Sequence, residues 1–592
     1  MMHMRRELRA AIVVAALLSV SSFAHAQDFN QVAPKQPAPQ QPGVVTPPPP
    51  VKVTPPPEIK TLIPSLKGLR LVPAVGWIAR NGAHEAGITA QYLPLLQKPE
   101  IQAQLSAFIG KPLTTADLPR ISKTIIDWYR AHSRPVVDVA FPEQDISTGV
   151  LQAVVAEYRV GQVRVEGNQW FSSGILADEM SLEHGDVIDF DLLRSDLNWL
   201  NRNPFRQVNV VLERSQEVGA TDVVLKAQDQ LPLRVYASYD NEGQRITGRE
   251  RYSAGFNWGD VFGLDQQVSY QFSTSPDLWR STHRGPGLSN NPRYTAHSFT
   301  YFAPLPWGDG IDVFGAYVQQ VPDLGPFFGQ VGHSFQLSGR YDMRLPATES
   351  IAQQIRVGFD FKRTDNNLAF GGIRIFAAAT VIDQFLLIYD GTRPDDWGQT
   401  ALENTFVYSP GHFGPSNSTA VFQASGVNGA DAQYVYDNLQ ITRVTDLPWE
   451  MSWLVRGTAQ IAGSELLPSE QLGAGGVDSV RGYDPRVVNG SQGVLLSSEL
   501  RSPPVHPLRD FTDLGVEDQW QALVFWDYGA VSYKNDQVNL PKSVTLASVG
   551  VGARYSIADY LDARFDYGWQ LRKLPGATKH GNLATISVTL SY

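Results

Sequence analysis

Few residues in this sequence are arranged for catalysis or for holding a cofactor. A glycine cluster at 473–476 could wrap a phosphate group, but no strand–turn–helix pattern surrounds it as a dinucleotide site requires. The 11 histidines are scattered without the spacing of metal ligands. No Gly-x-Ser-x-Gly turn and no Walker-type phosphate loop occurs. The sequence therefore predicts no enzymatic activity, no cofactor and no metal, and the glycine cluster is interpreted as a flexible stretch of the chain.

The composition restricts the class of protein. The chain has 592 residues, a formal net charge of −10 and no cysteine. It is too long for one compact domain but suits a large closed barrel with small accessory domains. The acidic balance argues against a nucleic-acid partner, which would need clustered lysine and arginine. Without cysteine there is no disulfide framework, no thiolate nucleophile and no lipoprotein anchor.

The first residues are typical of a secretory signal. Arginines at 5, 6 and 9 precede an apolar run at 11–20, and Ala24 and Ala26 supply the small residues that a signal peptidase reads. The apolar run is too short to cross a bilayer as a helix. We expect residues 1–26 to be a cleaved signal peptide.

Residues 27–64 are rich in proline, with four consecutive prolines at 47–50. Proline fixes φ and lacks a backbone donor, so the stretch from 34 to 57 is expected to form neither helix nor sheet. The composition predicts an extended, semi-rigid periplasmic linker.

Residues 65–157 and 158–230 each predict a small α+β domain. Both contain one helix whose apolar residues recur at spacings of three and four, followed by short strands. The repeated order of helix and strands indicates two copies of one module. The helical stripes are Leu118, Ile121, Ile125 and Trp128 in the first copy, and Phe190, Leu193, Leu197 and Leu200 in the second.

Residues 231–592 predict a transmembrane antiparallel β-barrel of about 16 strands. Segments of about ten residues alternate apolar and polar, as at 355–362 and 561–569, with turn residues between them. A soluble sandwich would also alternate, but charged residues recur on the polar face, as a hydrophilic lumen requires. Only helices and closed barrels satisfy every backbone group in hydrocarbon. The last strand ends on Tyr592, which resembles the terminal signal of bacterial outer-membrane barrels.

Several stretches resemble the TpsB transporters of two-partner secretion, which export haemolysins and filamentous haemagglutinin. Residues 141–151 resemble the end of the family's first POTRA domain, and 197–205 with Thr221-Asp222 resemble its second. Residues 475–484 contain the family's Val-Arg-Gly-Tyr loop motif, and Phe-Trp-Asp-Tyr-Gly at 525–529 resembles the acidic wall motif that accompanies it.

The resemblance implies a function and partners. Two periplasmic POTRA domains would capture an unfolded large exoprotein, a TpsA-like adhesin or haemolysin, which crosses the barrel and folds outside the cell. The barrel would sit in outer-membrane lipid after insertion by the barrel-assembly machinery. The open edge of each POTRA sheet could accept an extended chain as an added strand. Many family members carry an N-terminal plug helix, for which the short stretch before the prolines leaves little room.

The resemblance also assigns the site. Its long loop, at about 461–490 here, folds back into the barrel, and Arg481 reaches Asp527 on the inner wall. Strand alternation places Phe525 on the same face as Asp527. In a wet lumen this pair would be worth only about 0–1 kcal/mol. Arg481→Ala is therefore predicted to leave membrane insertion intact and reduce export. The remaining candidates are Val480, Gly482 and Tyr483 in the loop and Glu499 on the wall.

Three alternatives remain open. A barrel-assembly insertase of the same superfamily usually carries more than two POTRA domains. A passive porin or surface receptor leaves the Arg481 loop without a purpose. A secreted enzyme lacks a catalytic constellation. The turn at 203–205 could contact the partner, but it is interpreted as the end of a helix before a strand.

Overall fold

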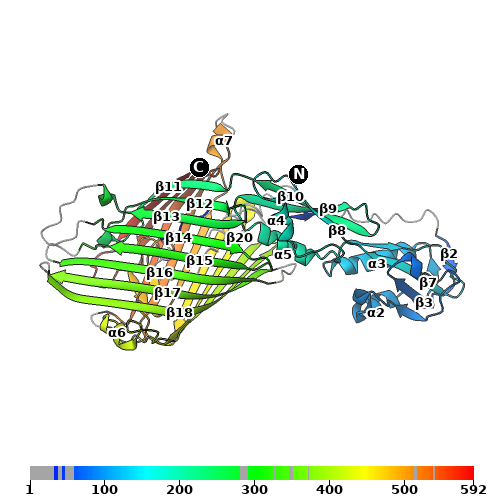
Figure 1. Ribbon diagram of the computed structural model, residues 1–592, viewed down its shortest axis with the longest axis horizontal. Coiled ribbons are helices and arrows are strands. Elements are labelled where there is room, and N and C mark those ends of the chain that lie inside the picture. The colour runs from blue at the N-terminus through cyan, green and yellow to red at the C-terminus, as the bar shows by residue number, and fades with distance from the viewer. Residues whose placement is uncertain are drawn as a thin grey trace.

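The computed structural model describes residues 32–37, 43–46, 59–279, 291–323, 328–345, 351–370, 373–511, 516–537 and 540–592. Two α+β domains follow one another and lead to a closed barrel of sixteen strands (Figure 1). The predicted signal peptide lies outside the described residues. We call the barrel rim that faces the two domains the near rim. No helix in the described ranges is both long and apolar enough to span a membrane.

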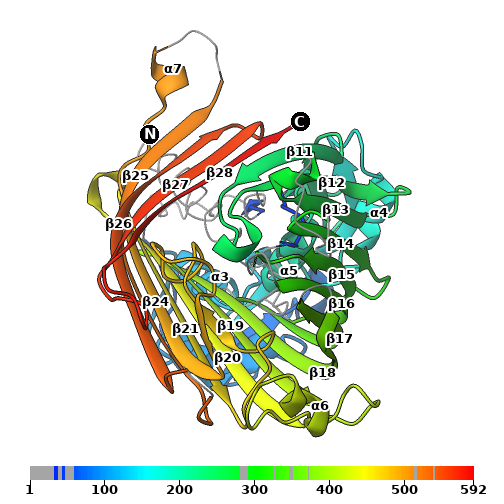
Figure 2. The same cartoon turned by 90° about the vertical axis from the view of Figure 1, so that its left-hand side faces the viewer.

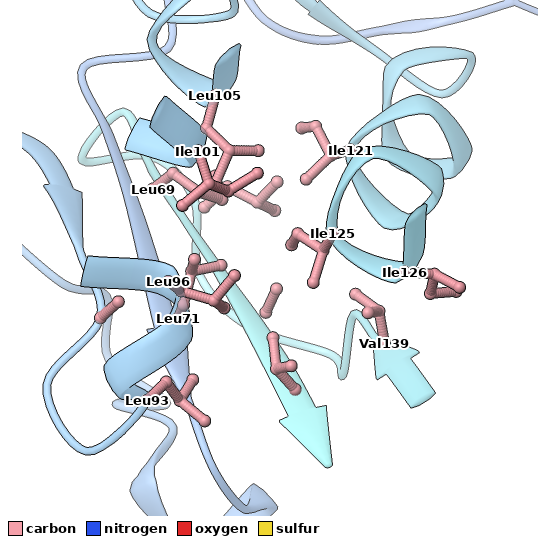
Figure 3. Packing of buried hydrophobic residues seen from close by; sticks show 14 of the residues in the cluster. Leu69, Leu71, Leu93, Leu96, Ile101, Leu105, Ile121, Ile125, Ile126 and Val139 are labelled. Carbon is pink, nitrogen blue, oxygen red and sulfur yellow. The ribbon is translucent and has the colours of Figure 1, made fainter. Parts of the chain in front are cut away.

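The first α+β domain packs two helices on a four-stranded sheet of order β4-β3-β7-β6. Ile121 and Ile125 of the predicted helical stripe are fully buried, and Figure 3 shows them facing Leu69 and Leu96 in the core. Strands β4 and β6 are the two edges of this sheet. The elements are β2 (Thr61–Ile63), β3 (Gly68–Val72), β4 (Gly87–Thr89), α2 (Pro99–Ser106), β5 (Leu113–Thr114), α3 (Asp117–Arg130), β6 (Val137–Ala140) and β7 (Val150–Glu157).

The second α+β domain repeats the plan. The Asp189 side chain caps its main helix by accepting from the backbone N–H of Asp191. The predicted stripe of this helix, including Leu193 and Leu197, is buried on the sheet. The elements are β8 (Arg159–Glu166), α4 (Ser173–Asp178), α5 (Phe190–Leu200), β9 (Arg206–Arg214) and β10 (Ala220–Asp229).

The predicted linker departs from expectation in two places. Residues 32–37 lie inside the barrel rather than in the periplasm: Lys35 Nζ donates to Thr589 Oγ1 at 3.0 Å, and Val32 packs on Phe314. The polar lumen wall satisfies the backbone of this segment, which its sequence could not reveal. The short strand β1 (Val45–Thr46) pairs with β9, so this stretch does enter a sheet. It does so between the proline clusters, where backbone donors are present.

The barrel confirms the prediction of about sixteen antiparallel strands. It closes where β11 pairs with β28, side by side in Figure 2. Two short helices, α6 (Thr419–Ala424) and α7 (Pro507–Phe511), lie in the connections after β19 and β24. The strands are β11 (Leu233–Asp240), β12 (Arg251–Val261), β13 (Gln266–Thr274), β14 (Tyr294–Pro304), β15 (Gly310–Gln320), β16 (Phe328–Arg344), β17 (Ala352–Phe370), β18 (Ile373–Asp395), β19 (Gly398–Ser409), β20 (Tyr434–Asp446), β21 (Ser452–Ala462), β24 (Gln492–Arg501), β25 (Asp518–Ser532), β26 (Ser543–Ile557), β27 (Leu561–Gln570) and β28 (Asn582–Ser591).

Strand alternation gives the barrel an apolar outside and a polar lumen. In β14, Phe299 points outward and is 40% exposed, whereas Ser298 and Thr300 point inward and are buried. The inward positions of the other strands carry Ser, Thr, Gln, Asp, Glu and Arg side chains around a central cavity. This distribution is the one that a barrel needs in a bilayer.

A buried arginine fastens the second α+β domain to the near rim. Arg206 at the start of β9 is 1% exposed and donates to both carboxylate oxygens of Asp265 in the β12–β13 turn, with Nη2–Oδ2 at 2.8 Å. Asn203 donates to Asp265 Oδ1 at 2.8 Å, so the 203–205 turn does more than end a helix. Burial, then the Asp265 charge, raises the pKa of Glu179 to about 8. Glu179 Oε2 also lies 3.6 Å from Arg206 Nη2.

Arg206→Met is expected to loosen this junction, because breaking a buried ion pair costs about 3–5 kcal/mol. Spin labels on Val218→Cys and Trp307→Cys, in a chain without other cysteines, would report a broadened distance distribution between domain and barrel. Arg164→Met, on an exposed face of the same domain, serves as the control and should keep the narrow distribution. Equal widths of the distance distribution in the Arg206→Met and Arg164→Met variants would contradict a junction held by Arg206.

Candidate functional site: a loop folded into the barrel

The connection between β21 and β24, residues 463–491 and called L6 below, turns back into the barrel. It carries a short hairpin of β22 (Leu472–Ala474) and β23 (Val488–Gly490). Its first limb buries Leu466 and Leu467 in a cluster with side chains of β18, β19 and β20. Farther along, Val480 and Tyr483 pack with side chains of β25 and β26. L6 therefore crosses the lumen from one wall to another.

Arg481 is fixed at the second wall by Asp527 of β25. Arg481 Nε donates to Asp527 Oδ2 at 2.8 Å, and Nη2 donates to Oδ1 at 2.9 Å. The Arg481 backbone N–H also donates to Oδ2, at 3.0 Å. This two-pronged contact uses the planar fork of the guanidinium, which a lysine could not reproduce.

Two further predicted residues contact the guanidinium. Arg481 Nη1 donates to Glu499 Oε2 at 2.7 Å from the neighbouring strand β24. Arg481 Cζ lies 3.6 Å from the centroid of the Phe525 ring, a cation–π contact. The structure thus brings Arg481, Asp527, Glu499 and Phe525 together. We call these residues, with Asp566 and Ser497, the Arg481 cluster.

Asp566 and Ser497 were not identified from the sequence. Asp566 Oδ1 lies 3.5 Å from Arg481 Nη1, and Ser497 Oγ accepts from Nη2 at 3.2 Å. Alternation along β27 already places Asp566 on the polar face. Which loop it meets depends on how strands far apart in the chain are aligned, and that information is absent from any single strand.

The pair is buried, contrary to the expectation of a wet lumen. The side chains of Arg481 and Asp527 are 5% and 0% exposed. In the low effective dielectric of such a site, losing one partner costs about 3–5 kcal/mol rather than 0–1 kcal/mol. The charges balance locally, because three carboxylates face three arginines. The carboxylates are Glu499, Asp527 and Asp566, and the arginines are Arg481, Arg501 and Arg554.

The other loop residues set the close approach of L6 to the wall. Gly482 has φ +89°, and a Cβ there would lie 2.9 Å from the carbonyl oxygen of Gly568 in β27. Gln570 Nε2 donates to the Gly482 carbonyl at 2.7 Å. Tyr483 is 1% exposed and its hydroxyl donates to the Ala547 carbonyl at 3.0 Å. Val480 is fully buried beside Gly529.

A sixteen-stranded barrel with an apolar outside, a polar lumen, an in-folded loop and two α+β domains at one rim defines an outer-membrane barrel of the POTRA-bearing class. The family model described as haemolysin secretion/activation protein ShlB/FhaC/HecB matches residues 219–366 and 404–555. The ShlB-type POTRA model matches 87–157, and a POTRA model described as surface antigen variable number repeat matches 158–228. The chain belongs to the ShlB/FhaC/HecB family. It is an outer-membrane transporter of two-partner secretion with its POTRA domains in the periplasm, as the sequence resemblance predicted.

Individual relatives agree with this assignment. The heme/hemopexin transporter protein HuxB of Haemophilus influenzae is 23% identical over 512 residues, covering 81% of this chain and 84% of that protein. The outer membrane transporter CdiB of Escherichia coli is 25% identical over 414 residues, covering 68% and 66%. The solved structure of CdiB from Escherichia coli has the same fold, with a TM-score of 0.73 at 18% identity, covering 92% of this chain and 93% of that one.

Gly568→Val is expected to displace the L6 tip, because any Cβ at 568 would lie 2.6 Å from the Gly482 backbone nitrogen. The strand itself should tolerate the change, since valine favours strands. In planar lipid bilayers the purified variant should open more often or to a larger conductance than the parent. Gly457→Val, where a Cβ meets no atom within 4 Å, is the matched control and should behave as the parent. Identical conductance traces for Gly568→Val and the parent would contradict the prediction that this close contact holds the L6 tip in a position that restricts the channel.

Proposed function

We propose that this transporter exports one large secreted protein, a TpsA-like adhesin or haemolysin, and that the Arg481 cluster holds L6 across its path. The observation that carries the proposal is the burial of three carboxylates and a guanidinium where a loop meets the lumen wall. Burying that many charges costs free energy unless each is paired. A passive pore needs no such site. A channel that carries a large cargo only at intervals must be closed between passages, and a loop fixed in the lumen can close it.

Capture of the partner is assigned to the POTRA sheets. Strands β4 and β6 are edges of the first sheet, with backbone groups available for pairing. An unfolded polypeptide can add to such an edge through main-chain hydrogen bonds, with little dependence on its side chains. This mode suits a cargo that is kept unfolded in the periplasm.

Passage is assigned to the lumen. An unfolded chain carries unpaired backbone donors and acceptors, which need polar partners or water throughout. The inward side chains supply such partners along the cavity, among them Ser269, Thr300, Gln384 and Thr405. The periplasm supplies no nucleotide, so folding of the partner outside the cell would give the process its direction. No enzymatic step by this chain is required.

Membrane lipid and the barrel-assembly machinery complete the proposed partners. Outward residues such as Phe299, Leu387 and Trp526 present an apolar belt for lipid. A barrel of sixteen strands needs help to enter the membrane, and the barrel-assembly machinery is the proposed partner for this step.

Arg481→Ala should reduce export of the partner at least tenfold while the barrel still assembles. The test compares surface and supernatant proteins of a deletion strain complemented with parent, Arg481→Ala or Arg481→Lys. Arg481→Lys keeps the positive charge but loses the two-pronged contact, so an intermediate level is expected. Arg443→Ala, which breaks a half-exposed pair with Asp395 on another strand, is the control and should export normally.

Heat-modifiable gel migration checks that each variant forms a barrel. Normal export by a folded Arg481→Ala variant would contradict the role of the cluster. A general fall in outer-membrane barrels in the deletion strain would indicate an insertase, and an unchanged set of secreted proteins would indicate a porin or receptor.

A further inference from the structure

L6 is held at a second place, on its first limb. The side chain of Glu470 is fully buried, and Lys362 Nζ of β17 donates to its two carboxylate oxygens at 2.8 and 2.9 Å. The Tyr436 hydroxyl of β20 donates to Glu470 Oε2 at 3.0 Å. Gln460 Nε2 of β21 donates to the Glu470 backbone carbonyl at 3.0 Å.

The wall around Lys362 is arranged to keep this contact charged and paired. Asp360 Oδ2 lies 3.7 Å from Lys362 Nζ, and the other carboxylate oxygen, Asp360 Oδ1, pairs with Arg340 of β16. Gln384 of β18 donates to Asp360 Oδ2 at 3.0 Å. Two cations thus face two anions, so the site is neutral only while Glu470 occupies it. Removing Glu470 would leave an excess buried cation, which is costly.

This contact uses different strands of the wall from those of the Arg481 cluster. In the closed order of sixteen strands, Lys362 lies on the seventh strand (β17) and Tyr436 on the tenth (β20), whereas the wall residues of the Arg481 cluster lie on the twelfth, thirteenth and fifteenth (β24, β25 and β27). Among the described residues, the two sets of ion pairs have no member in common. The apolar contacts divide in the same way, with Leu467 at the first wall and Tyr483 at the second.

We propose that Lys362, Tyr436 and Glu470 form a second latch, which positions the first limb of L6 against the β17–β20 wall independently of the Arg481 cluster. Release of Arg481 alone would free the tip of L6 but leave its first limb in the lumen. Full clearance would need both latches to open. Only this consequence for export rests on the proposed function, since the latch itself is a property of the purified barrel.

The test uses the natural absence of cysteine to attach one spin label at a time. A label on Ser469→Cys reports the first limb, and a label on Val477→Cys reports the approach to Arg481. Glu470→Gln should raise the mobile fraction of the 469 label at least threefold and leave the 477 label unchanged. Arg481→Ala should do the reverse. Combining both substitutions should raise the open-channel conductance above that of either alone.

Several variants separate positioning from folding. Lys362→Arg keeps the charge and should retain an immobile 469 label, whereas Lys362→Met should release it. Tyr436→Phe removes one hydrogen bond without changing charge, and keeps the test available should Glu470→Gln fail to assemble. Glu403→Gln, a luminal acid paired with Arg356 away from L6, is the matched control.

Equal mobility at 469 in Glu470→Gln, Tyr436→Phe and the parent would overturn the second latch. A rise at both 469 and 477 in Glu470→Gln would overturn its independence from Arg481. Neither measurement uses the secreted partner, so failure of the proposed export function would be seen separately, as an unchanged set of secreted proteins in the deletion strain.

Discussion

The position of the L6 tip depends on one buried guanidinium. Arg481 has left bulk water, and its charge is tolerable only because Asp527 and Glu499 meet it with short, well-directed hydrogen bonds. Those carboxylates lie on adjacent strands β25 and β24, so the wall must be intact before the loop can dock. Once docked, the loop brings Gly482 and Tyr483 into contact with β26 and β27. The ion pairs of one arginine therefore couple completion of this part of the barrel wall to the placement of the L6 tip.

The barrel wall supplies these partners through simple alternation. Each strand that presents an apolar side chain to lipid presents a polar one to the lumen at the next residue. The lumen becomes a continuous polar surface on which segments from elsewhere in the chain dock: L6 on two separate parts of the wall, and residues 32–37 along β11–β15. At the near rim, Arg206 and Asp265 extend the same principle to the POTRA domain. Buried, paired charges thus fix L6 and the POTRA domain to the barrel, whereas residues 32–37 are held by hydrogen bonds and apolar contacts.

The sequence predicted the features that depend on local periodicity. Alternation over about ten residues marked the barrel strands, and the spacing of Ile121 and Ile125 marked a POTRA helix. Alternation also placed Phe525 with Asp527, and the family motif led to Arg481. Contacts between distant segments were missed, because they depend on strand register around a closed barrel. Asp566, Lys362 and Glu470 are ordinary polar residues within their own segments. Residues 32–37 and 45–46 were misjudged for the same reason, since their backbones are satisfied by partners on β11–β14 and β9.

The central claim is that the secreted partner passes through the lumen, and site-specific photo-crosslinking tests it most directly. A photoreactive amino acid would replace inward-facing Thr300 or outward-facing Phe299, adjacent residues of β14. The partner would be arrested in transit by fusion to a stably folded domain. Our account predicts a crosslink to the arrested partner from position 300 and none from position 299. Crosslinks from 299 without any from 300 would place the partner outside the barrel and contradict the account.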